Sequence, residues 1–145
     1  MATVELALVL PTLVLLLFGT LEIGFMAKQA HSLNHVAREA ARIASTDATN
    51  ARIAAHIADV APGMNAGQIE ATLEQRTWDP QSSTWGSWSS LTDDGVENSA
   101  GAGDQIRVSL QYSYTLITGG LMASVLNASE DNTLELHSTI VSMRE

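Results

Sequence analysis

The chain has 145 residues and no cysteine. Disulfide bonds, thiolate zinc sites, covalent haem attachment and cysteine nucleophiles are therefore excluded. Basic residues are also scarce, with seven lysines and arginines against sixteen acidic residues and a formal net charge of −9. Eleven of the acidic residues but three of the basic ones lie in residues 67–145. Because an acidic surface repels phosphate groups, we expect no nucleic-acid partner.

Signatures of enzyme chemistry are absent as well. The sequence contains no Gly-x-Ser-x-Gly motif, phosphate-binding loop or dinucleotide fingerprint. Two groups have the residue types of metal ligands: the helical series His31, His35 and Glu39, and the loop acids Asp93, Asp94, Glu97 and Asp104. Histidines four residues apart can share a metal, but a site usually needs a third strong ligand and supporting partners, and inter-subunit hydrogen bonds or solvation are commoner. The acidic loop could supply calcium ligands but matches no EF-hand spacing, so a solvated loop is the default. We expect no enzyme activity, no metal and no cofactor.

The first 27 residues are strongly apolar. No charged residue lies between Leu6 and Leu21, and the apolar character continues to Ala27. A helix needs about 20 apolar residues to span a bilayer, so residues 1–27 are expected to form a transmembrane or filament-core helix. A cleaved secretory signal would need basic residues before the apolar run, and none precedes Lys28. A plain membrane anchor remains an alternative, although the positive-inside rule would then place the body in the cytoplasm unless a basic leader is removed.

Three residues within the apolar segment are unusual there. Glu5 lies four residues from the amino group of Met1. In parallel, staggered helices the Glu5 carboxylate of one chain could meet the Met1 ammonium of another; alternatively, Glu5 lies among lipid headgroups. Pro11 is expected to interrupt the helix, because its ring clashes with the carbonyl of the preceding turn. Glu22 places a second carboxylate near the end of the run.

These residues carry a resemblance to a known family. The segments Met-Ala-Thr-Val-Glu-Leu-Ala-Leu-Val-Leu-Pro (1–11), Gly-Thr-Leu-Glu-Ile-Gly (19–24) and Ala-Arg-Glu-Ala-Ala-Arg (37–42) resemble the N-terminal signature of TadE-like pilins, in the tight-adherence branch of the type IV pilus superfamily. The resemblance covers about the first 45 residues. It implies a prepilin cut by a prepilin peptidase to expose Met1, and a subunit extracted from the membrane into a fibre by an assembly platform. It also implies that Glu5 guides assembly.

Residues 28–66 are expected to continue the helix and add a second one. The first helix is predicted from about residue 2 to about residue 45. A mostly alanine seam of alternating four- and three-residue spacing should let another element approach closely; its members are Met26, Ala30, Leu33, Ala37, Ala40 and Ala44. Asp47 is predicted to cap a second helix ending near Ala61, before Pro62 and Gly63.

Residues 67–145 are predicted to form an acidic antiparallel β head. Strands are expected over residues 68–78, 84–91, 105–117 and 132–143, with a helical turn over Leu121–Leu126. A four-residue loop, Pro80 to Ser83, should set Trp78 opposite Trp85. The three tryptophans (Trp78, Trp85 and Trp88) could bind sugars or a surface, although cross-strand packing explains at least two. The expected class is α+β, a long N-terminal helix on a small four-stranded sheet like that of type IV pilins.

The sequence therefore predicts a structural pilin subunit that polymerises with itself through its N-terminal helix. The helix residues assigned to assembly are Met1, Glu5, Pro11 and Glu22, and those assigned to packing are Ala30, Leu33, Ala37, Ala40 and Ala44. The expected location is the inner membrane before assembly and a cell-surface filament afterwards. Adhesion follows from the resemblance alone. The alternative is a membrane-anchored binding or secretion-accessory protein, a minor pseudopilin, that never polymerises.

Overall fold

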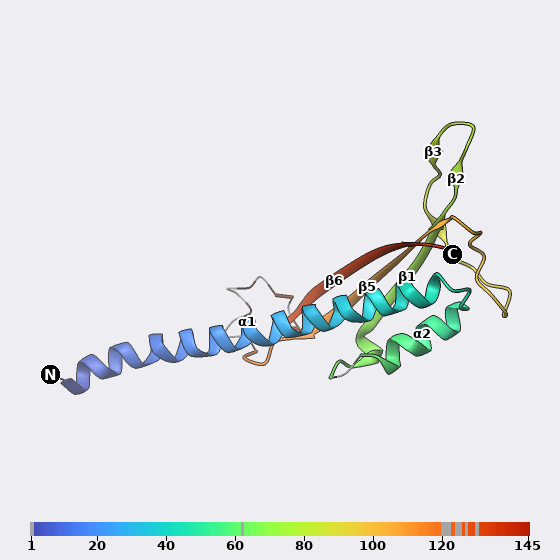
Figure 1. The fold of residues 1–145 in the computed structure, drawn as a ribbon. Helices are drawn as coiled ribbons and strands as arrows, with labels where there is room; N and C mark the ends of the chain where they lie inside the picture. The colour runs from blue at the N-terminus through green and yellow to red at the C-terminus, as the bar shows by residue number, and fades with distance from the viewer. Residues whose placement is uncertain (1, 62, 120–122, 124–125, 127, 130) are drawn as a thin grey trace. The chain divides into compact units, whose positions relative to one another are not determined.

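The computed structural model describes residues 2–61, 63–119, 123, 126, 128–129 and 131–145. Its elements are α1 (Ala2–Ala44), α2 (Asn50–Asp59), a 3-10 turn (Ala66–Gln68), β1 (Ile69–Arg76), β2 (Trp78–Asp79), β3 (Thr84–Trp85), β4 (Ser89–Ser90), β5 (Gln105–Thr115) and β6 (Thr133–Met143) (Figure 1). The chain divides into two compact units. One combines Met1–Gln29 with Ser113–Glu135, and the other combines Ala30–Tyr112 with Leu136–Glu145. The domain boundaries expected from the sequence, after residues 27 and 66, stay predictions.

In the first unit the main element is the N-terminal part of α1. Leucine and alanine, both good helix formers, dominate its sequence. The helix runs without a break through Pro11, so the prediction that Pro11 interrupts it is wrong. Proline removes one backbone hydrogen bond, and the turns on either side nonetheless keep their helical conformation. The helix ends at Ala44, which confirms the predicted extent of residues 2–45.

The second unit contains most of a four-stranded sheet of order β4-β1-β5-β6. β1 pairs antiparallel with β5, in a register that sets Leu73 opposite Val108 and Ala71 opposite Leu110. β5 alternates strictly between buried and partly exposed side chains. Its buried side chains are Ile106, Val108, Leu110, Tyr112 and Tyr114, which confirms the face expected from the sequence. The expected α+β class, a long helix packed on a four-stranded antiparallel sheet, is confirmed.

The C-terminal part of α1, from Ala30 onward, belongs to this second unit. β6 contacts it through polar groups: the Ser138 hydroxyl donates to Asn34 Oδ1 at 2.7 Å, and the Ser142 hydroxyl donates to the Ala41 carbonyl at 3.2 Å. Such contacts require the strand to approach the helix backbone closely, and alanine side chains leave room for this. The buried part of the alanine seam, Leu33, Ala37, Ala40 and Ala44, is covered within this unit.

The second helix starts later than expected. Asp47 does not cap it, because Asp47 lies in the turn between the helices with φ of +67°. Thr49 is the cap: it has an extended conformation, and its side chain accepts a hydrogen bond from the Arg52 amide. Ile53 and Ile57 form the buried side of α2. Of the residues expected to stop this helix, Gly63 has a left-handed conformation (φ of +74°), and Pro62 lies outside the described residues.

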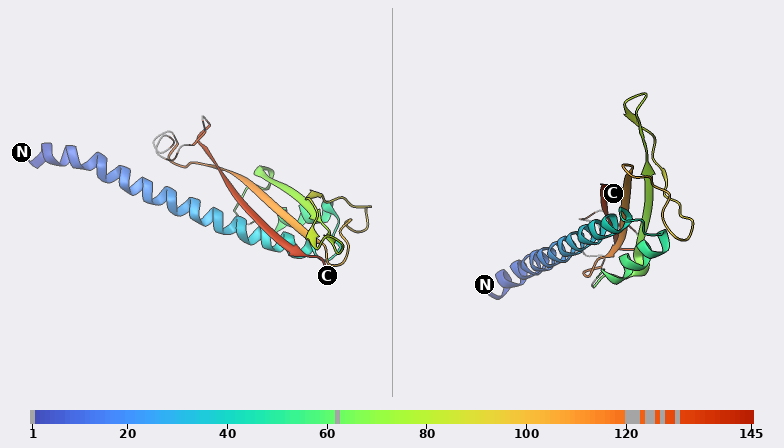
Figure 2. Two further views of the ribbon diagram at one scale, coloured as in Figure 1. Left: turned by 90° about the horizontal axis from the view of Figure 1, so that it is seen from above. Right: turned by 45° about the vertical axis from the view of Figure 1, so that its right-hand side comes forward.

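A separate two-stranded hairpin, β2–β3, extends away from the sheet in Figure 1 and in the right-hand view of Figure 2. It pairs Trp78 with Trp85, which confirms the predicted pairing. The return strand expected over residues 84–91 is wrong as one element, because the structure divides it into β3 and β4. The two remaining predicted strands, 105–117 and 132–143, correspond to β5 and β6. The helical turn expected over Leu121–Leu126 lies largely outside the described residues.

Candidate functional site

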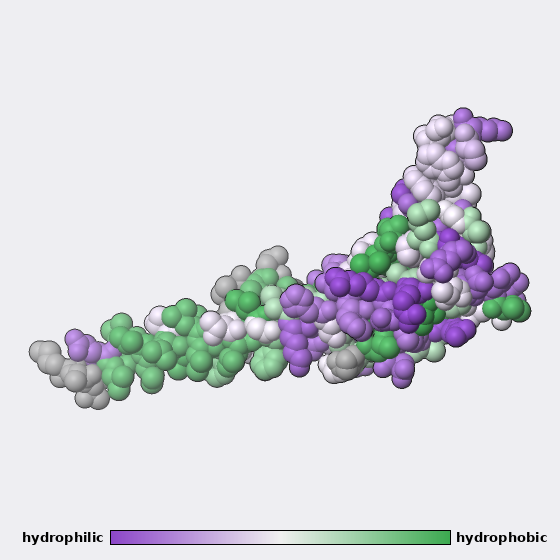
Figure 3. Space-filling view, viewed as in Figure 1, coloured by the Kyte–Doolittle hydropathy of each residue, from purple (hydrophilic) through white to green (hydrophobic). Residues whose placement is uncertain are grey.

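The N-terminal part of α1 exposes a continuous apolar surface. Every side chain from Glu5 to Phe18 is exposed, and Leu8, Leu13 and Leu16 retain 76%, 58% and 63% of their accessible surface. Figure 3 shows these hydrophobic side chains covering the N-terminal part of the helix. Soluble monomers rarely leave so much contiguous apolar surface in water. This surface therefore requires lipid or another protein as its environment.

Length and composition make α1 suitable for a membrane. Among the described residues, one helix is long and apolar enough to cross a bilayer, and its mean hydropathy reaches 2.3 over the most apolar window. From Leu6 to Leu21 the helix has a rise of about 24 Å. That is somewhat shorter than the roughly 30 Å of a bilayer's hydrocarbon core. The apolar residues Ile23 and Phe25, each about half exposed, extend the surface toward the full thickness.

Glu5 is the first carboxylate of this helix, in its first turn, with an exposed side chain. A carboxylate at a helix N-terminus is favoured by the unpaired amides there. Met1, its predicted partner in a neighbouring chain, lies outside the described residues. The pairing of Glu5 with Met1 therefore stays a prediction, and so does a location of Glu5 among lipid headgroups.

Glu22 has quite different surroundings. Its side chain retains 1% of its accessible surface, although Leu21 and Ile23 on either side are about half exposed. Four hydrogen bonds hold the carboxylate. One oxygen accepts from the Tyr114 hydroxyl at 2.8 Å and the Ile117 amide at 3.0 Å, and the other accepts from the amide and hydroxyl of Thr118 at 2.8 and 2.7 Å.

All four partners of Glu22 are donors, so its carboxylate acts as an acceptor only, as an ionised carboxylate does. Hydrogen bonds to an ionised group are stronger than those between neutral groups. Within its unit, the Glu22 cradle (Glu22 with Tyr114, Ile117 and Thr118) thus fixes the end of β5 and the following turn to one face of α1. The cradle holds these segments in position, and it contains no nucleophile with an adjacent base.

The residues assigned to helix packing lie in the second unit. Leu33, Ala37, Ala40 and Ala44 have no accessible surface, while Ala30 is partly exposed. Within a single chain, four of the five are therefore buried inside the head. Whether Ala30 contacts a neighbouring helix in an assembly stays a prediction. Pro11 lies on the exposed part of α1.

The acidic loop around residues 93–104 is satisfied internally. Asp93 accepts a hydrogen bond from the Asn50 amide at the start of α2. The backbone amides of Glu97 and Val96 hold the pKa of Asp94 below its usual value. The guanidinium of Arg144 contacts the carboxylates of Asp47 and Glu97 and donates to Asn98 Oδ1 at 2.7 Å. Arg144 thus supplies the positive charge that these acids attract.

Metal-ligand residue types do not converge in the described part of the chain. No group of three or more histidine, cysteine, aspartate or glutamate side chains lies close enough there to hold an ion. His31 and His35 are both exposed on α1, and the Glu39 carboxylate instead contacts Arg42 at 3.0 Å.

Sequence reasoning named Glu22 but missed its partners. Tyr114, Ile117 and Thr118 lie 92 to 96 residues away along the chain. No motif links them to Glu22; only the general rule that a carboxylate in an apolar helix needs donors would have prompted a search. Arg144 was missed for a similar reason, because a lone arginine at the penultimate position of the sequence is usually solvated.

Comparison with known proteins gives a family match for the N-terminal segment. The family described as TadE-like protein matches residues 1–42. No curated protein and no solved structure matches the chain. The match confirms the resemblance of the N-terminal segment, and it ends at residue 42, before the head begins. Over residues 1–42, the chain is similar to the TadE-like proteins.

Proposed function

We propose that the chain is a structural pilin subunit that polymerises through α1 into an extracellular Tad-type filament. TadE-like membership associates the chain with Tad pilus machinery. The observation that supports polymerisation is the exposure of every side chain from Glu5 to Phe18, on a helix that projects no other charge before Glu22. Copies of α1 packed against each other would remove this surface from water and from lipid.

Burial in a bundle of helices gives the apolar segment a dry environment after it leaves the membrane. Each fully buried leucine contributes about 1.5–3 kcal/mol relative to exposure in water. In such a bundle Glu5 would be an uncompensated charge. Pairing with the amino group of a neighbouring chain offsets that penalty and sets the axial stagger. Before assembly, the same surface would hold the subunit in the inner membrane, exposed to a prepilin peptidase and the assembly platform.

Adhesion or surface attachment is the role we propose for the filament. We also propose that the chain has no enzyme activity, since the residues that the structure brings together around Glu22 and Arg144 position backbone segments. The second candidate function is a membrane-anchored accessory protein that never polymerises. It is favoured by the length of the apolar run, which suits a bilayer as well as a bundle.

Electron microscopy of material sheared from cells tests this proposal. We expect thin fibres whose main component, by mass spectrometry, is this chain. Glu5→Ala should reduce fibre yield about tenfold or more, while the head remains folded. The matched control is Glu39→Ala, which removes a carboxylate from the exposed side of the same helix and should leave fibre yield unchanged. Normal fibres from Glu5→Ala would show that the carboxylate is not needed for assembly. Failure to find the chain outside detergent-extracted membranes would favour the accessory role.

A further inference from the structure

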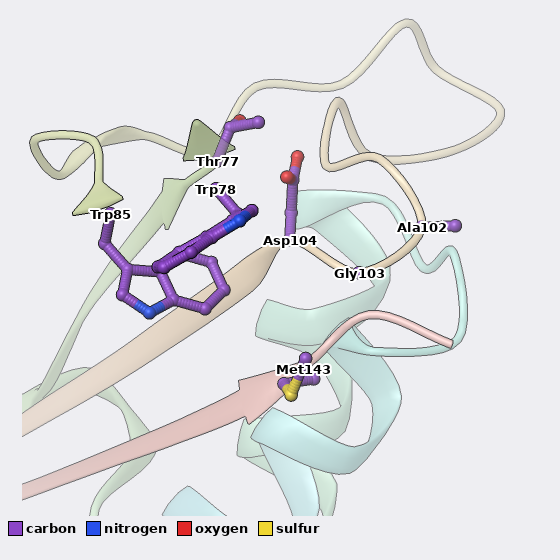
Figure 4. Close-up of a pocket in the computed structure, with 7 residues that line it drawn as sticks. All are labelled: Thr77, Trp78, Trp85, Ala102, Gly103, Asp104 and Met143. Carbon is purple, nitrogen blue, oxygen red and sulfur yellow. The ribbon is translucent and has the colours of Figure 1, made fainter. Parts of the chain in front are cut away.

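The head contains a pocket that includes no residue of the apolar helix proposed to drive assembly. It encloses about 570 Å³ and is lined by Thr77, Trp78, Trp85, Ala102, Gly103, Asp104 and Met143. Figure 4 shows the two indoles, the Asp104 carboxylate and the Met143 thioether arranged around this space. Its volume lies in the range of small-ligand sites, about 300–1,000 Å³. All its residues belong to the second compact unit.

The two indoles of this pocket, one exposed and one partly buried, are held in a fixed geometry. Trp78 retains 42% of its accessible surface, which is unusual because tryptophan is highly buried on average. Its ring packs edge-to-face against Trp85, with centroids 5.3 Å apart and planes at 68°. The hairpin register pairs the two residues directly. An aromatic pair held in one geometry by the backbone, with Trp78 exposed, is a preorganised contact surface.

Two arginine side chains pack against the rings of Trp85 and Trp88. The Arg76 guanidinium lies 5.2 Å from the Trp85 ring and 4.4 Å from the Trp88 ring, and Arg107 lies 4.3 Å from the Trp88 ring. Hydrogen bonds from Arg76 to Gln105 and from Arg107 to Glu74, at 2.8 and 2.7 Å, fix both guanidinium groups. Trp88 is therefore explained by packing, whereas Trp78 keeps a free surface.

We propose that this pocket binds a neutral pyranose sugar. The C–H face of a pyranose ring matches an indole surface, and its hydroxyl groups match the acceptors at the rim. Asp104 supplies such an acceptor: one carboxylate oxygen accepts from the Gly101 amide at 2.8 Å, and its side chain lines the pocket. The Thr77 hydroxyl can donate or accept. Apolar walls with a few polar groups that fix orientation are typical of small-molecule sites.

An organic cation fits the pocket less well. Aromatic rings and a carboxylate do attract cations. However, Arg76 already lies over Trp85, and a second positive charge on that ring would be repelled by the guanidinium. A neutral ligand avoids this repulsion. The proposal goes beyond filament assembly and does not depend on it, because none of its residues lies on the exposed part of α1.

Saturation-transfer NMR on the full-length chain in detergent micelles tests the proposal. The probes are methyl pyranosides and short neutral oligosaccharides, with tetramethylammonium chloride as the cationic comparison. We expect saturation of the ring C–H protons of at least one sugar. In ¹H–¹⁵N spectra that sugar should shift the indole N–H signals of Trp78 and Trp85, while the signal of Trp88 stays in place. Because micelles hold unassembled subunits, a failure here leaves the filament proposal untouched.

Substitutions at the pocket test whether the sugar binds there. Trp78→Ala should weaken sugar affinity about tenfold or more, corresponding to about 1.4 kcal/mol. Trp78→Phe should recover part of that loss, and Asp104→Asn should weaken binding about threefold or more, since one acceptor remains. Val96→Ala, at an exposed apolar position of the loop (82% exposed), is the control and should bind normally. Should Trp78→Ala fail to fold, the indole shifts of the intact protein still decide the question. Three results would overturn the proposal: no saturation transfer to any sugar, unchanged sugar binding by a folded Trp78→Ala variant, or saturation transfer to tetramethylammonium and to no sugar.

Discussion

At the residue scale, Glu22 is a buried carboxylate within an exposed apolar stretch of α1. The side chains before it are exposed and apolar, whereas Glu22 itself is buried against the end of β5. A buried carboxylate is tolerated only where hydrogen bonds replace its water, and the Glu22 cradle supplies four. Within its unit, the residue therefore tethers the end of β5 and the turn after it to α1.

Glu22→Gln should release this tether. The amide nitrogen of glutamine is a donor, and it cannot accept the hydrogen bonds that the carboxylate oxygen accepts now. Each lost hydrogen bond to a charged group contributes about 1.5–3 kcal/mol. We expect faster hydrogen exchange at the Ile117 and Thr118 amides, measured by mass spectrometry or NMR in micelles. Glu39→Gln, on the same helix but at its surface, is the control and should leave that exchange unchanged. Equal protection in Glu22→Gln and the native protein would show that the carboxylate does not hold the turn.

Residue identity alone predicted part of this site. Glu5 and Glu22 stand out in the sequence because charge is rare in an apolar helix. The partners of Glu22 do not stand out, since tyrosine and threonine are ordinary residues of a strand and a turn. Two of the four donors are backbone amides, which have no sequence signal at all. Only the tertiary fold brings them together.

At the element scale, the alanine seam determines how closely β6 approaches α1. Ala37 has no accessible surface, and an added isobutyl group there would need space that the packed helix and sheet do not offer. Ala37→Leu should lower the free energy of unfolding of the head by about 1–3 kcal/mol.

Thermal unfolding followed by near-ultraviolet circular dichroism measures the effect of Ala37→Leu. The matched control is Ala55→Leu, at an exposed position of α2, which should change stability by about 0.5 kcal/mol or less. If both variants unfold at the same temperature, the seam is not packed as the structure describes.

The end of β6 is held by a second side chain, Arg144. Its guanidinium binds the Asn98 side chain and the Ala100 carbonyl, and it contacts Asp47 and Glu97. With a 10% exposed side chain, Arg144 links the loop between the helices, the acidic loop and the C-terminal strand.

Arg144→Ala should leave these acceptors unpaired and lower the free energy of unfolding by about 2–4 kcal/mol. Chemical denaturation monitored by circular dichroism would measure the loss. Arg38→Ala is the control, because Arg38 is exposed on α1 and its removal should have little effect. A loss as small as that of the control would mean that Arg144 is solvated.

Helices and strands with strong periodic patterns were predictable from the sequence, whereas the helix cap and the break in the return strand were not. The alternation of β5 and the length of α1 follow directly from apolar spacing. The N-cap of α2 was misplaced by two residues, since Asp47 and Thr49 are both good caps and tertiary packing decides between them. The division of the return strand was also missed. The Gly86 amide still continues the hairpin pairing by donating to the Thr77 carbonyl, whereas Ser89 pairs with Gln75 of β1 in a register shifted by one residue.

At the scale of the whole molecule, the chain combines an apolar helix that requires shelter with an acidic head. The family match ends at residue 42, so the likeness to TadE-like proteins lies in the helix. This arrangement suits a subunit whose assembly depends on α1 while the head presents its own surface, including the tryptophan pocket.

The central claim is that copies of the chain shelter each other's apolar helices. Because the sequence contains no cysteine, Leu13→Cys would place a single thiol at a 58% exposed position of α1. Treatment of sheared extracellular material with a short bis-maleimide, followed by denaturing electrophoresis, measures whether these thiols are neighbours. We predict a ladder at multiples of the 15.4 kDa chain, and no ladder for Val96→Cys on the head loop. A single band of monomer at Leu13→Cys, with the protein confined to the membrane under every growth condition, would contradict the account.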